Sequence, residues 1–149
     1  MGAIEVPRVR SASVLDVPSL SALSREAGSS WSSAMILAEL SCSWSRTWVI
    51  ESDDELVAFC IAWVVTQELQ ILNVGTAQHR RRQGLARLVI TQSFEYARTQ
   101  GCQWAHLEVR KGNQAAIALY RSLNFADAGR RANYYSDNGE TALLMRREL

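Results

Sequence analysis

The sequence is organised around the stretch Gln78-His79-Arg80-Arg81-Arg82-Gln83-Gly84-Leu85-Ala86-Arg87. It follows an apolar run, residues 69–74, that is typical of a strand, and it precedes a helix-compatible run, residues 85–98. Backbone N–H groups at a helix start lack intrahelical partners, and the helix dipole favours negative charge there. Gly84 lets the backbone approach a ligand closely, and the arginines add positive charge, so the stretch has the parts of a phosphate site. The residues alone leave a solvated basic turn equally open.

Length and composition indicate a single globular domain. At 149 residues the chain can bury a substantial core, and its hydrophobic fraction of 48% and charged fraction of 21% are ordinary. The formal net charge of +1 argues against a general nucleic-acid-binding protein, so the arginine cluster is a local feature.

Apolar runs and cysteine spacing indicate where the protein resides and whether it binds a metal. No apolar run approaches the 18 residues of a transmembrane helix, and residues 1–10 lack a signal-peptide pattern. Cys42, Cys60 and Cys102 are an odd number of cysteines without metal-ligand spacing. We therefore expect a cytoplasmic protein with no metal centre and no membrane partner.

Hydrophobic periodicity and turn residues predict alternating strands and helices. The expected strands are residues 4–10, 47–50, 56–65, 69–74, 104–109, 125–131 and 142–146. The expected helices are residues 15–28, 31–40, 85–98 and 113–123. Strand, helix and strand over residues 69–109 imply a right-handed parallel crossover. The fold class is therefore α/β: one domain over residues 1–149, with a mixed, mostly antiparallel central sheet, one parallel βαβ crossover and flanking helices.

Several finer expectations follow from individual residues. Residues 56–65 are apolar enough for a central strand buried on both faces. Gly75 at a strand end indicates a bulge or a close approach by another group. One face of the helix over residues 85–98 is expected to carry the apolar residues Ala86, Ile90, Phe94 and Ala97.

The phosphate-loop motifs Gly-x-x-x-x-Gly-Lys-Ser/Thr and Gly-x-Gly-x-x-Gly are both absent. Instead, residues 81–86 (Arg-Arg-Gln-Gly-Leu-Ala) resemble the Gln/Arg-x-x-Gly-x-Gly/Ala signature of the GNAT acetyltransferase superfamily. In that superfamily the loop holds the pyrophosphate of acetyl-coenzyme A, so the resemblance implies this co-substrate. The cofactor-binding residues that it implies are Val74, Gly75, Thr76, Arg81, Arg82, Gln83, Gly84, Leu85, Ala86, Arg87 and Asn113. Backbone groups of the first three would pair with the pantetheine arm like an added strand.

The second half of the chain is similar to the ribosomal-protein-alanine N-acetyltransferases, the RimI type. The similarity is carried by Leu107-Glu108-Val109-Arg110, Asn113, residues 115–125, 130–135 and 139–145, and by Trp31-Ser32 near the front. The chain departs from the family where Ser29-Ser30 replace an aromatic-Pro pair and Thr141 replaces Asp, and both changes bear on peptide specificity. Gly75-Thr76-Ala77 likewise replace the more usual Ala-Val-Asp.

Acetyl transfer to an amine needs a base, and Glu108 is the candidate. Glu108 ends a mostly apolar strand segment, where burial would raise its pKa towards the working range of a base. The resemblance also puts the family's general base at Glu108. An ion pair with Arg110 or another arginine is the alternative role.

Tyr120 is the candidate acid. Its phenol can donate a proton to the departing sulfur, and the resemblance assigns the general acid to this position. The alternative is a core tyrosine between helix and sheet. Asn113 suits the N-cap of the same helix, beside its implied contact with coenzyme A.

Tyr134 and Tyr135 are the candidate substrate-binding residues, because exposed aromatic side chains after arginines suit peptide binding. A packed hairpin edge is equally open. His79 lies in a solvated basic loop and His106 has no recognisable partner, so neither is expected to be catalytic.

The resemblance implies direct attack, in a ternary complex, by the N-terminal alanine of small-subunit ribosomal protein eighteen. It further implies a protein substrate and no direct contact with nucleic acid, and we expect a monomer. An N-terminal α-amine has a pKa of roughly 8 against roughly 10.4 for lysine, so a weak base suffices for it. The alternatives are a lysine or small-molecule acceptor, a non-catalytic acyl-coenzyme A sensor, and a nucleic-acid-binding module.

Overall fold

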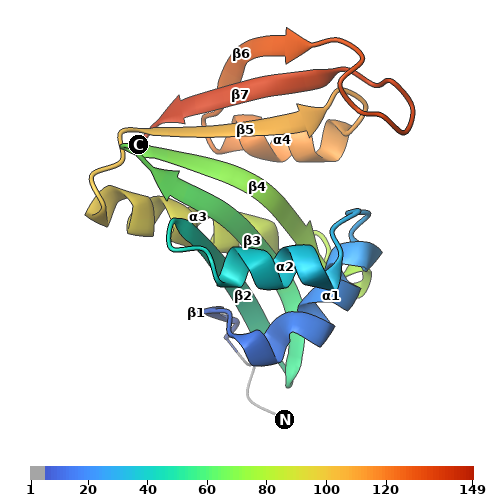
Figure 1. Ribbon diagram of the computed structural model, residues 1–149, viewed down its shortest axis with the longest axis vertical. Coiled ribbons are helices and arrows are strands. Elements are labelled where there is room, and N and C mark those ends of the chain that lie inside the picture. Colours follow the sequence, from blue (N-terminus) through green and yellow to red (C-terminus); the bar gives the residue numbers. More distant parts are fainter. Residues whose placement is uncertain (1–5) are drawn as a thin grey trace.

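The computed structural model describes residues 6–149, in which a twisted sheet carries helices on both faces (Figure 1). Within these residues the sheet has seven strands in the order β1-β2-β3-β4-β5-β7-β6. The strands are β1 (Arg8–Ser11), β2 (Ser45–Ser52), β3 (Glu55–Val65), β4 (Glu68–Thr76), β5 (Trp104–Arg110), β6 (Ala126–Arg131) and β7 (Ala142–Glu148). The helices are α1 (Val17–Glu26), α2 (Ser33–Leu40), α3 (Leu85–Thr99) and α4 (Gln114–Ser122), with 3₁₀ turns η1 (Val14–Asp16) and η2 (Gln78–Arg80).

The strand pairing confirms the predicted fold class. Among the described strands, β4 and β5 are parallel and every other neighbouring pair is antiparallel. α3 connects the two parallel strands, which is the crossover that the sequence predicts. In Figure 1, α1 and α2 lie in front of the sheet and α3 lies behind it. α4 adjoins α3, because Arg87 Nη2 donates to Ser122 Oγ over 2.5 Å.

The element boundaries differ from the prediction mainly at strand ends. Residues 4 and 5 of the first expected strand lie outside the described residues, and β1 begins at Arg8, directly after Pro7. β2 extends from Ser45 to Ser52 rather than over residues 47–50, because its polar ends also pair with β3. Hydrophobic periodicity detects the buried middle of a strand and misses polar ends that are held by backbone hydrogen bonds.

The core forms where β3 meets α3. The stretch of β3 from Val57 to Ala62 is completely buried, as predicted for a strand covered on both faces. The buried face of α3 consists of Leu85, Val89, Ile90, Ser93, Phe94 and Ala97. Burying one large aliphatic or aromatic side chain contributes roughly 1.5–3 kcal/mol, so this layer anchors the start of α3. Of the four residues predicted to share this face, Ile90, Phe94 and Ala97 are buried, and Ala86 is half-buried.

The sheet opens between β4 and β5, and this opening creates the site. The two strands pair only from Glu68–Trp104 to Ile71–Leu107. Directly beyond Ile71 a β-bulge leaves Leu72 without a partner on β3, since Ile61 faces Asn73 and Ala62 faces Ile71. A bulge increases local twist and bends the strand. From Asn73 onward the edge of β4 that faces β5 is therefore released from the ladder.

Gly75 is a point of close packing. A Cβ atom at Gly75 would lie 2.5 Å from the Phe59 ring and 2.6 Å from the Ala27 side chain. The predicted close approach is therefore real, whereas the bulge lies three positions earlier, at Leu72. This packing holds the end of β4 against α1 and fixes the wall of the opening.

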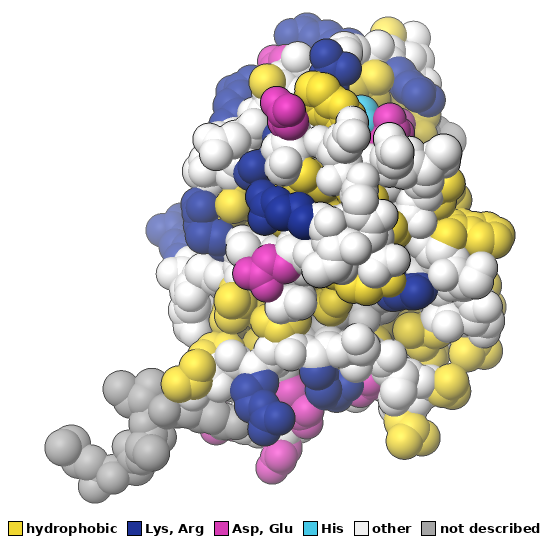
Figure 2. All heavy atoms as spheres, turned by 90° about the vertical axis from the view of Figure 1, so that its left-hand side faces the viewer, with side chains coloured by type: hydrophobic (Ala, Val, Ile, Leu, Met, Phe, Trp, Pro, Cys, Tyr) yellow, Lys and Arg dark blue, Asp and Glu magenta, His cyan; other side chains and the backbone are white. Residues whose placement is uncertain are grey.

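The molecular surface mixes side chains of every kind. On the face shown in Figure 2, arginine, acidic and hydrophobic side chains are interspersed. This face thus carries both signs of charge, in keeping with the formal net charge of +1. Of the helices between residues 6 and 149, none has both the length and the apolar character needed to cross a bilayer.

Candidate active site

Two cavities occupy the opening between β4 and β5. The first, of about 230 Å³, is lined by the α1–α2 connection, β4, β5 and Tyr135. The second, of about 690 Å³, runs along the end of β4, the basic loop, the start of α3 and the first turns of α4. Ala27, Val74, Asn113 and Tyr120 line both of them. After the roles that the sequence analysis predicts for their residues, we call the first the acceptor pocket and the second the cofactor groove.

The cofactor groove collects most of the residues that the sequence predicts for it. Its lining includes Val74, Gly75, Thr76, Arg81, Arg82, Gly84, Leu85, Ala86, Arg87 and Asn113. Gln83 is the exception, because its Oε1 accepts a hydrogen bond from Arg80 Nε over 2.9 Å. Arg80, which was not predicted as a cofactor-binding residue, does line the groove. It also donates a hydrogen bond to Ser52 Oγ over 3.1 Å.

The basic loop adopts the backbone shape that an anion site requires. Gly84 is the N-cap of α3 with a left-handed φ of 76°, and Arg82 has a φ of 62°. A non-glycine residue in this region stores on the order of 1–3 kcal/mol of strain, a cost that clusters at functional sites. The first N–H groups of α3 have no intrahelical partner, and the arginines line the same groove. These features suit a phosphorylated ligand.

The open edge of β4 borders both cavities. Val74, Gly75 and Thr76 pair with β3 on one side only, through Cys60, Phe59 and Ala58. Their other edge faces the opening, so backbone groups are available to an extended ligand. This geometry suits the predicted pantetheine contact.

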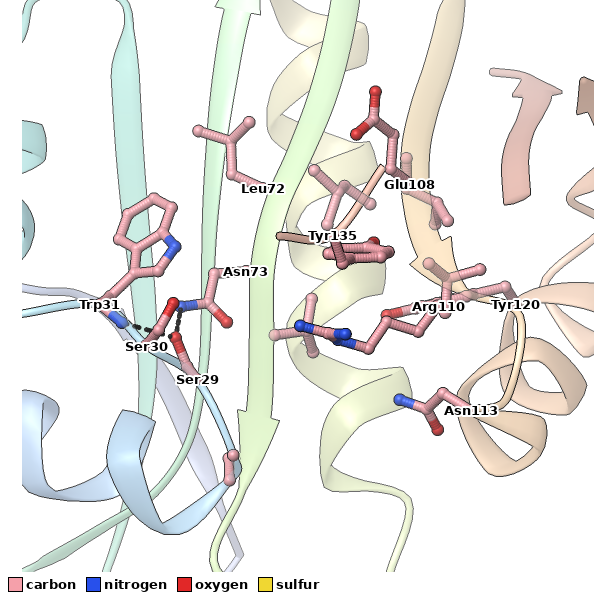
Figure 3. Close-up of a pocket in the computed structure, with 16 residues that line it drawn as sticks. Ser29, Ser30, Trp31, Leu72, Asn73, Glu108, Arg110, Asn113, Tyr120 and Tyr135 are labelled. Atoms are coloured by element: carbon pink, nitrogen blue, oxygen red, sulfur yellow. Dashed lines mark hydrogen bonds between the residues drawn. The ribbon is translucent and has the colours of Figure 1, made fainter. Parts of the chain in front are cut away.

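Glu108 lines the acceptor pocket (Figure 3). Alternation along β5 buries Leu107 and Val109 and turns Glu108 to the other face, where 25% of its side chain is exposed. Its Oε1 lies 3.8 Å from Arg131 Nη2, and its carboxylate is near enough to Tyr134 to raise the pKa of that phenol. The predicted burial of Glu108 is therefore only partial.

Arg110 does not pair with Glu108. It forms ion pairs with Asp137 and Glu140 instead, at 3.0 Å and 3.3 Å. Of the arginine partners that the sequence left open for Glu108, the structure selects Arg131, and at 3.8 Å this contact is loose. The Glu108 carboxylate therefore remains available to a ligand in the pocket.

Tyr120 lies where the two cavities meet. Its ring packs edge-on against Phe125, with centroids 6.0 Å apart. Burial raises the pKa of Tyr120 to about 12, so its phenol stays protonated well above neutral pH. The packing role and a proton-donor role are thus compatible in one residue.

Asn113, like Tyr120, has a structural role and also lies at the site. Its Oδ1 accepts a hydrogen bond from Ala116 N–H over 3.2 Å and caps α4, as predicted. The residue also lines both cavities, which brings the α4 N-terminus to the site.

The structure separates the two tyrosines of the β6–β7 loop. Tyr135 lines the acceptor pocket, whereas Tyr134 is 44% exposed and lies outside it, near Glu108 and Arg131. The rings contact each other edge-on at 5.2 Å. Both tyrosines therefore lie near Glu108, but of the two only Tyr135 lines the acceptor pocket.

The histidines lie apart from the two cavities. His79 is 3.5 Å from Glu55, and His106 is 3.5 Å from Glu68 at the paired end of β5. In residues 6–149 no cluster of His, Cys, Asp and Glu side chains has the arrangement of a metal site.

Sequence reasoning missed Asn73 as a pocket residue. Its Nδ2 donates to Ser29 Oγ over 3.0 Å and to Ser24 Oγ over 3.4 Å, which orients the amide (Figure 3). Ser29 Oγ also accepts from Trp31 N–H over 3.2 Å. Since both serines engage the amide nitrogen, Oδ1 of Asn73 is directed away from them. The available signal was a polar residue interrupting the apolar run Ile71-Leu72-Asn73-Val74.

Comparisons with known proteins agree on one family. The model of the acetyltransferase (GNAT) family matches residues 18–125. Ribosomal protein bS18-alanine N-acetyltransferase of Salmonella typhimurium is 38% identical over 98 residues, which are 64% of this chain and 66% of that protein. The chain spans just under two thirds of the bS18-alanine N-acetyltransferases that it matches, from 64% to 66% of their lengths.

Solved structures extend the similarity over nearly the whole chain. Ribosomal-protein-S18-alanine N-acetyltransferase from Escherichia coli has a TM-score of 0.88 and 29% identity, covering 96% of this chain and 94% of that one. Ard1 from Thermoplasma volcanium has a TM-score of 0.85 and 25% identity, covering 96% and 97%.

Proposed function

The chain belongs to the acetyltransferase (GNAT) family, and from this premise we propose that it transfers an acetyl group from acetyl-coenzyme A to the N-terminal α-amine of a protein. The family and the fold predicted from the sequence are confirmed. The proposal treats residues 1–149 as one acetyltransferase domain that acts as a monomer.

One observation carries the proposal: a basic groove and a pocket bearing a carboxylate meet at Tyr120. A donor in the groove and an acceptor in the pocket would reach each other only at that junction. Since both reactants would be held together, direct transfer needs no covalent intermediate on the protein.

The groove residues fit acetyl-coenzyme A. Arg81, Arg82 and Arg87, with the start of α3, would hold its phosphates, and the open edge of β4 would pair with its amide-bearing arm. When bound, acetyl-coenzyme A supplies the acetyl group as an activated thioester.

The protein's own residues would manage the protons. Glu108 would accept a proton from the α-ammonium, directly or through a water, so that a neutral nitrogen attacks the thioester carbonyl. A backbone N–H of residues 74–76 would stabilise the charge that develops on the carbonyl oxygen. As the C–N bond forms and the C–S bond breaks, Tyr120 would donate its phenolic proton to the leaving sulfur. Its raised pKa keeps that proton in place before the transfer. The proton that the nitrogen loses as the amide forms would restore the phenol, directly or through water.

We propose the N-terminal alanine of ribosomal protein S18 as the acceptor. The support is the activity for which the Salmonella and Escherichia relatives are named, together with a small acceptor pocket of about 230 Å³. An N-terminal amine with a pKa of roughly 8 also suits a partly exposed carboxylate base better than lysine does. A ribosomal-protein substrate would place the enzyme in the cytoplasm.

The test is acetyl transfer to short peptides that differ only in their first residue. A matched peptide with a blocked N-terminus and one free lysine is the control, and thiol release reports turnover. We expect activity on the alanine peptide and none on the blocked peptide. Activity on the blocked peptide alone would assign a lysine acceptor. Binding of acetyl-coenzyme A without any turnover would favour a small-molecule acceptor or a sensor.

A further inference from the structure

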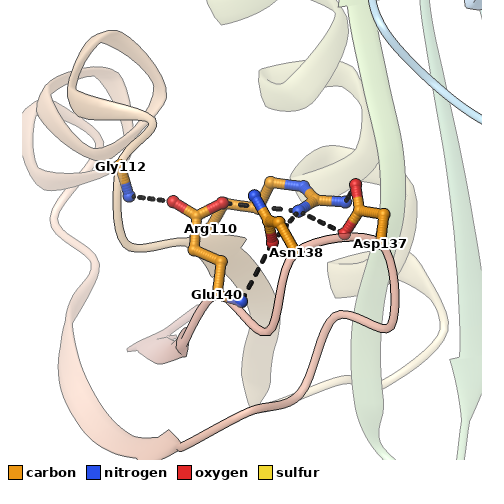
Figure 4. A network of polar contacts seen from close by, with 5 residues as sticks. All are labelled: Arg110, Gly112, Asp137, Asn138 and Glu140. Atoms are coloured by element: carbon orange, nitrogen blue, oxygen red, sulfur yellow. Dashed lines mark hydrogen bonds and ion pairs between the residues drawn. The ribbon is translucent and has the colours of Figure 1, made fainter.

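Arg110 lines the acceptor pocket and occupies the centre of a polar network at its edge (Figure 4). Its Nη1 and Nη2 donate to the two carboxylate oxygens of Asp137, over 3.1 Å and 3.0 Å. Nη1 also donates to Glu140 Oε1 over 3.3 Å and to Asn138 Oδ1 over 3.4 Å. One guanidinium on β5 therefore holds three residues of the β6–β7 loop.

The network continues to the turn that precedes α4. The second oxygen of Glu140, Oε2, accepts a hydrogen bond from Gly112 N–H over 2.8 Å. A Cβ atom at Gly112 would lie 2.5 Å from that oxygen, so only glycine lets the carboxylate sit there. Lys111 N–H donates to Thr141 O over 3.0 Å and ties the same two segments through their backbones.

Arg110 also contacts the loop through an aromatic ring. Its guanidinium carbon lies 3.9 Å from the centroid of the Tyr135 ring, a cation–π contact. Tyr135 is the loop residue that lines the acceptor pocket. Two backbone bonds close a turn behind it, from Gly139 N–H to Tyr135 O over 2.7 Å and from Tyr135 N–H to Glu140 O over 3.3 Å.

Arg110 is paired with two carboxylates, those of Asp137 and Glu140, so the network carries no excess positive charge. The hydrogen bond from Arg110 lowers the pKa of Asp137, so this carboxylate stays ionised at neutral pH. With Asp137 and Glu140 engaged, the Arg110 cation is compensated before any ligand arrives. An uncompensated guanidinium on β5 would compete with an acceptor ammonium for Glu108, two positions away.

We infer that Arg110 is a positioning residue for the acceptor: it holds the β6–β7 loop, residues 132–141, so that Tyr135 forms a wall of the acceptor pocket. The inference rests on the proposed function for the identity of the acceptor. It adds a determinant of peptide affinity that acts through the position of Tyr135.

The experiment compares Arg110→Lys and Gly112→Ala with the unchanged protein. Lysine keeps the positive charge but loses the planar fork that bonds Asp137 and Glu140 together. Alanine at position 112 keeps every charge and displaces the Glu140 carboxylate. Arg121→Lys is the matched control, because Arg121 forms an exposed ion pair with Asp127 at 3.3 Å, outside both cavities.

Three quantities are measured: KM for an alanine-starting peptide, KM for acetyl-coenzyme A, and amide hydrogen exchange in residues 132–141. For Arg110→Lys we expect about a tenfold rise in peptide KM, a cofactor KM within about twofold of the original, and exchange faster by about tenfold. Gly112→Ala should change the same quantities in the same direction by a smaller factor. Arg121→Lys should leave all three unchanged.

Two results would overturn the inference. Faster exchange with an unchanged peptide KM would make the network structural only, and unchanged exchange would show that Arg110 does not hold the loop. If the unchanged protein acetylates no peptide at all, the proposed function fails. The exchange measurement would then still decide whether Arg110 holds the loop.

Discussion

Tyr134, in the loop between β6 and β7, lies beside the carboxylate of Glu108 on β5. The nearby negative carboxylate raises the pKa of Tyr134, because it favours the protonated phenol. Arg131 approaches the same carboxylate to 3.8 Å. The proposed base is thus flanked by two groups of one hairpin, and an acceptor amine has to share Glu108 with them.

Replacing Glu108 tests the base directly. Glu108→Gln keeps the size of the side chain and removes its ability to take a proton. We expect turnover to fall by about 10²–10³-fold, the range of general-base effects. Acetyl-coenzyme A affinity, measured by calorimetry, should stay the same, since Glu108 lines the acceptor pocket and not the groove. Turnover at the original level would refute the assignment.

Replacing Tyr120 separates acid catalysis from packing. Tyr120→Phe retains the ring that packs against Phe125 and removes only the hydroxyl. We expect the chemical step to slow by about 10–100-fold, with both KM values within about threefold. Single-turnover kinetics with the alanine peptide would measure this. A normal rate would leave Tyr120 with its packing role alone.

The same substitution predicts a change in alkaline stability. The pKa of Tyr120 is raised from 10.0 to about 12 by burial, so between these values the unfolded chain releases a proton that the folded chain retains. The free energy of unfolding contributed by this group therefore falls as pH rises from 10 to 12, by roughly 2–3 kcal/mol. Denaturant titrations at pH 9 and pH 11 should show a smaller fall in Tyr120→Phe. Equal falls in both proteins would contradict the prediction.

Two glycines offer a matched test of the basic loop. Gly84 and Gly101 have left-handed φ values of 76° and 80°, and a Cβ atom at either would meet nothing within 4 Å. Alanine at either position should therefore cost about 1 kcal/mol of stability through backbone strain. Only Gly84→Ala should also raise KM for acetyl-coenzyme A, by about tenfold, because Gly84 lines the groove. Similar KM values in the two variants would remove the loop from cofactor binding.

Asn73 should matter for the acceptor and not for the donor. It lines the acceptor pocket alone, with its Nδ2 held by Ser29 and Ser24 and its Oδ1 free to accept from an ammonium. Asn73→Ala should raise peptide KM about tenfold, the value of one hydrogen bond to a charged group. Gln70→Ala, earlier on β4 and outside both cavities, is the control. Equal peptide KM values in the two variants would exclude this contact.

By itself, the sequence determined the local structure and most of the groove. Residues within about ten positions of one another encode each of these local features. They are the buried middles of the strands, the amphipathic face of α3, the Asn113 cap and the basic loop. The signature over residues 81–86 then indicated the family, and the resemblance to that family predicted the residues of the groove.

Only the tertiary structure decided how the acceptor side is assembled. Three features assemble it: β4 separates from β5 after Ile71, the Asn73 amide bonds Ser29, and Arg110 pairs with Asp137 and Glu140. The residues involved in each feature are 27 to 44 positions apart in the sequence. Periodicity and capping act over a few residues, because they reflect a helix turn or a strand pleat. Contacts between strand ends and distant loops depend on register, twist and bulges, which are set only when the whole sheet packs.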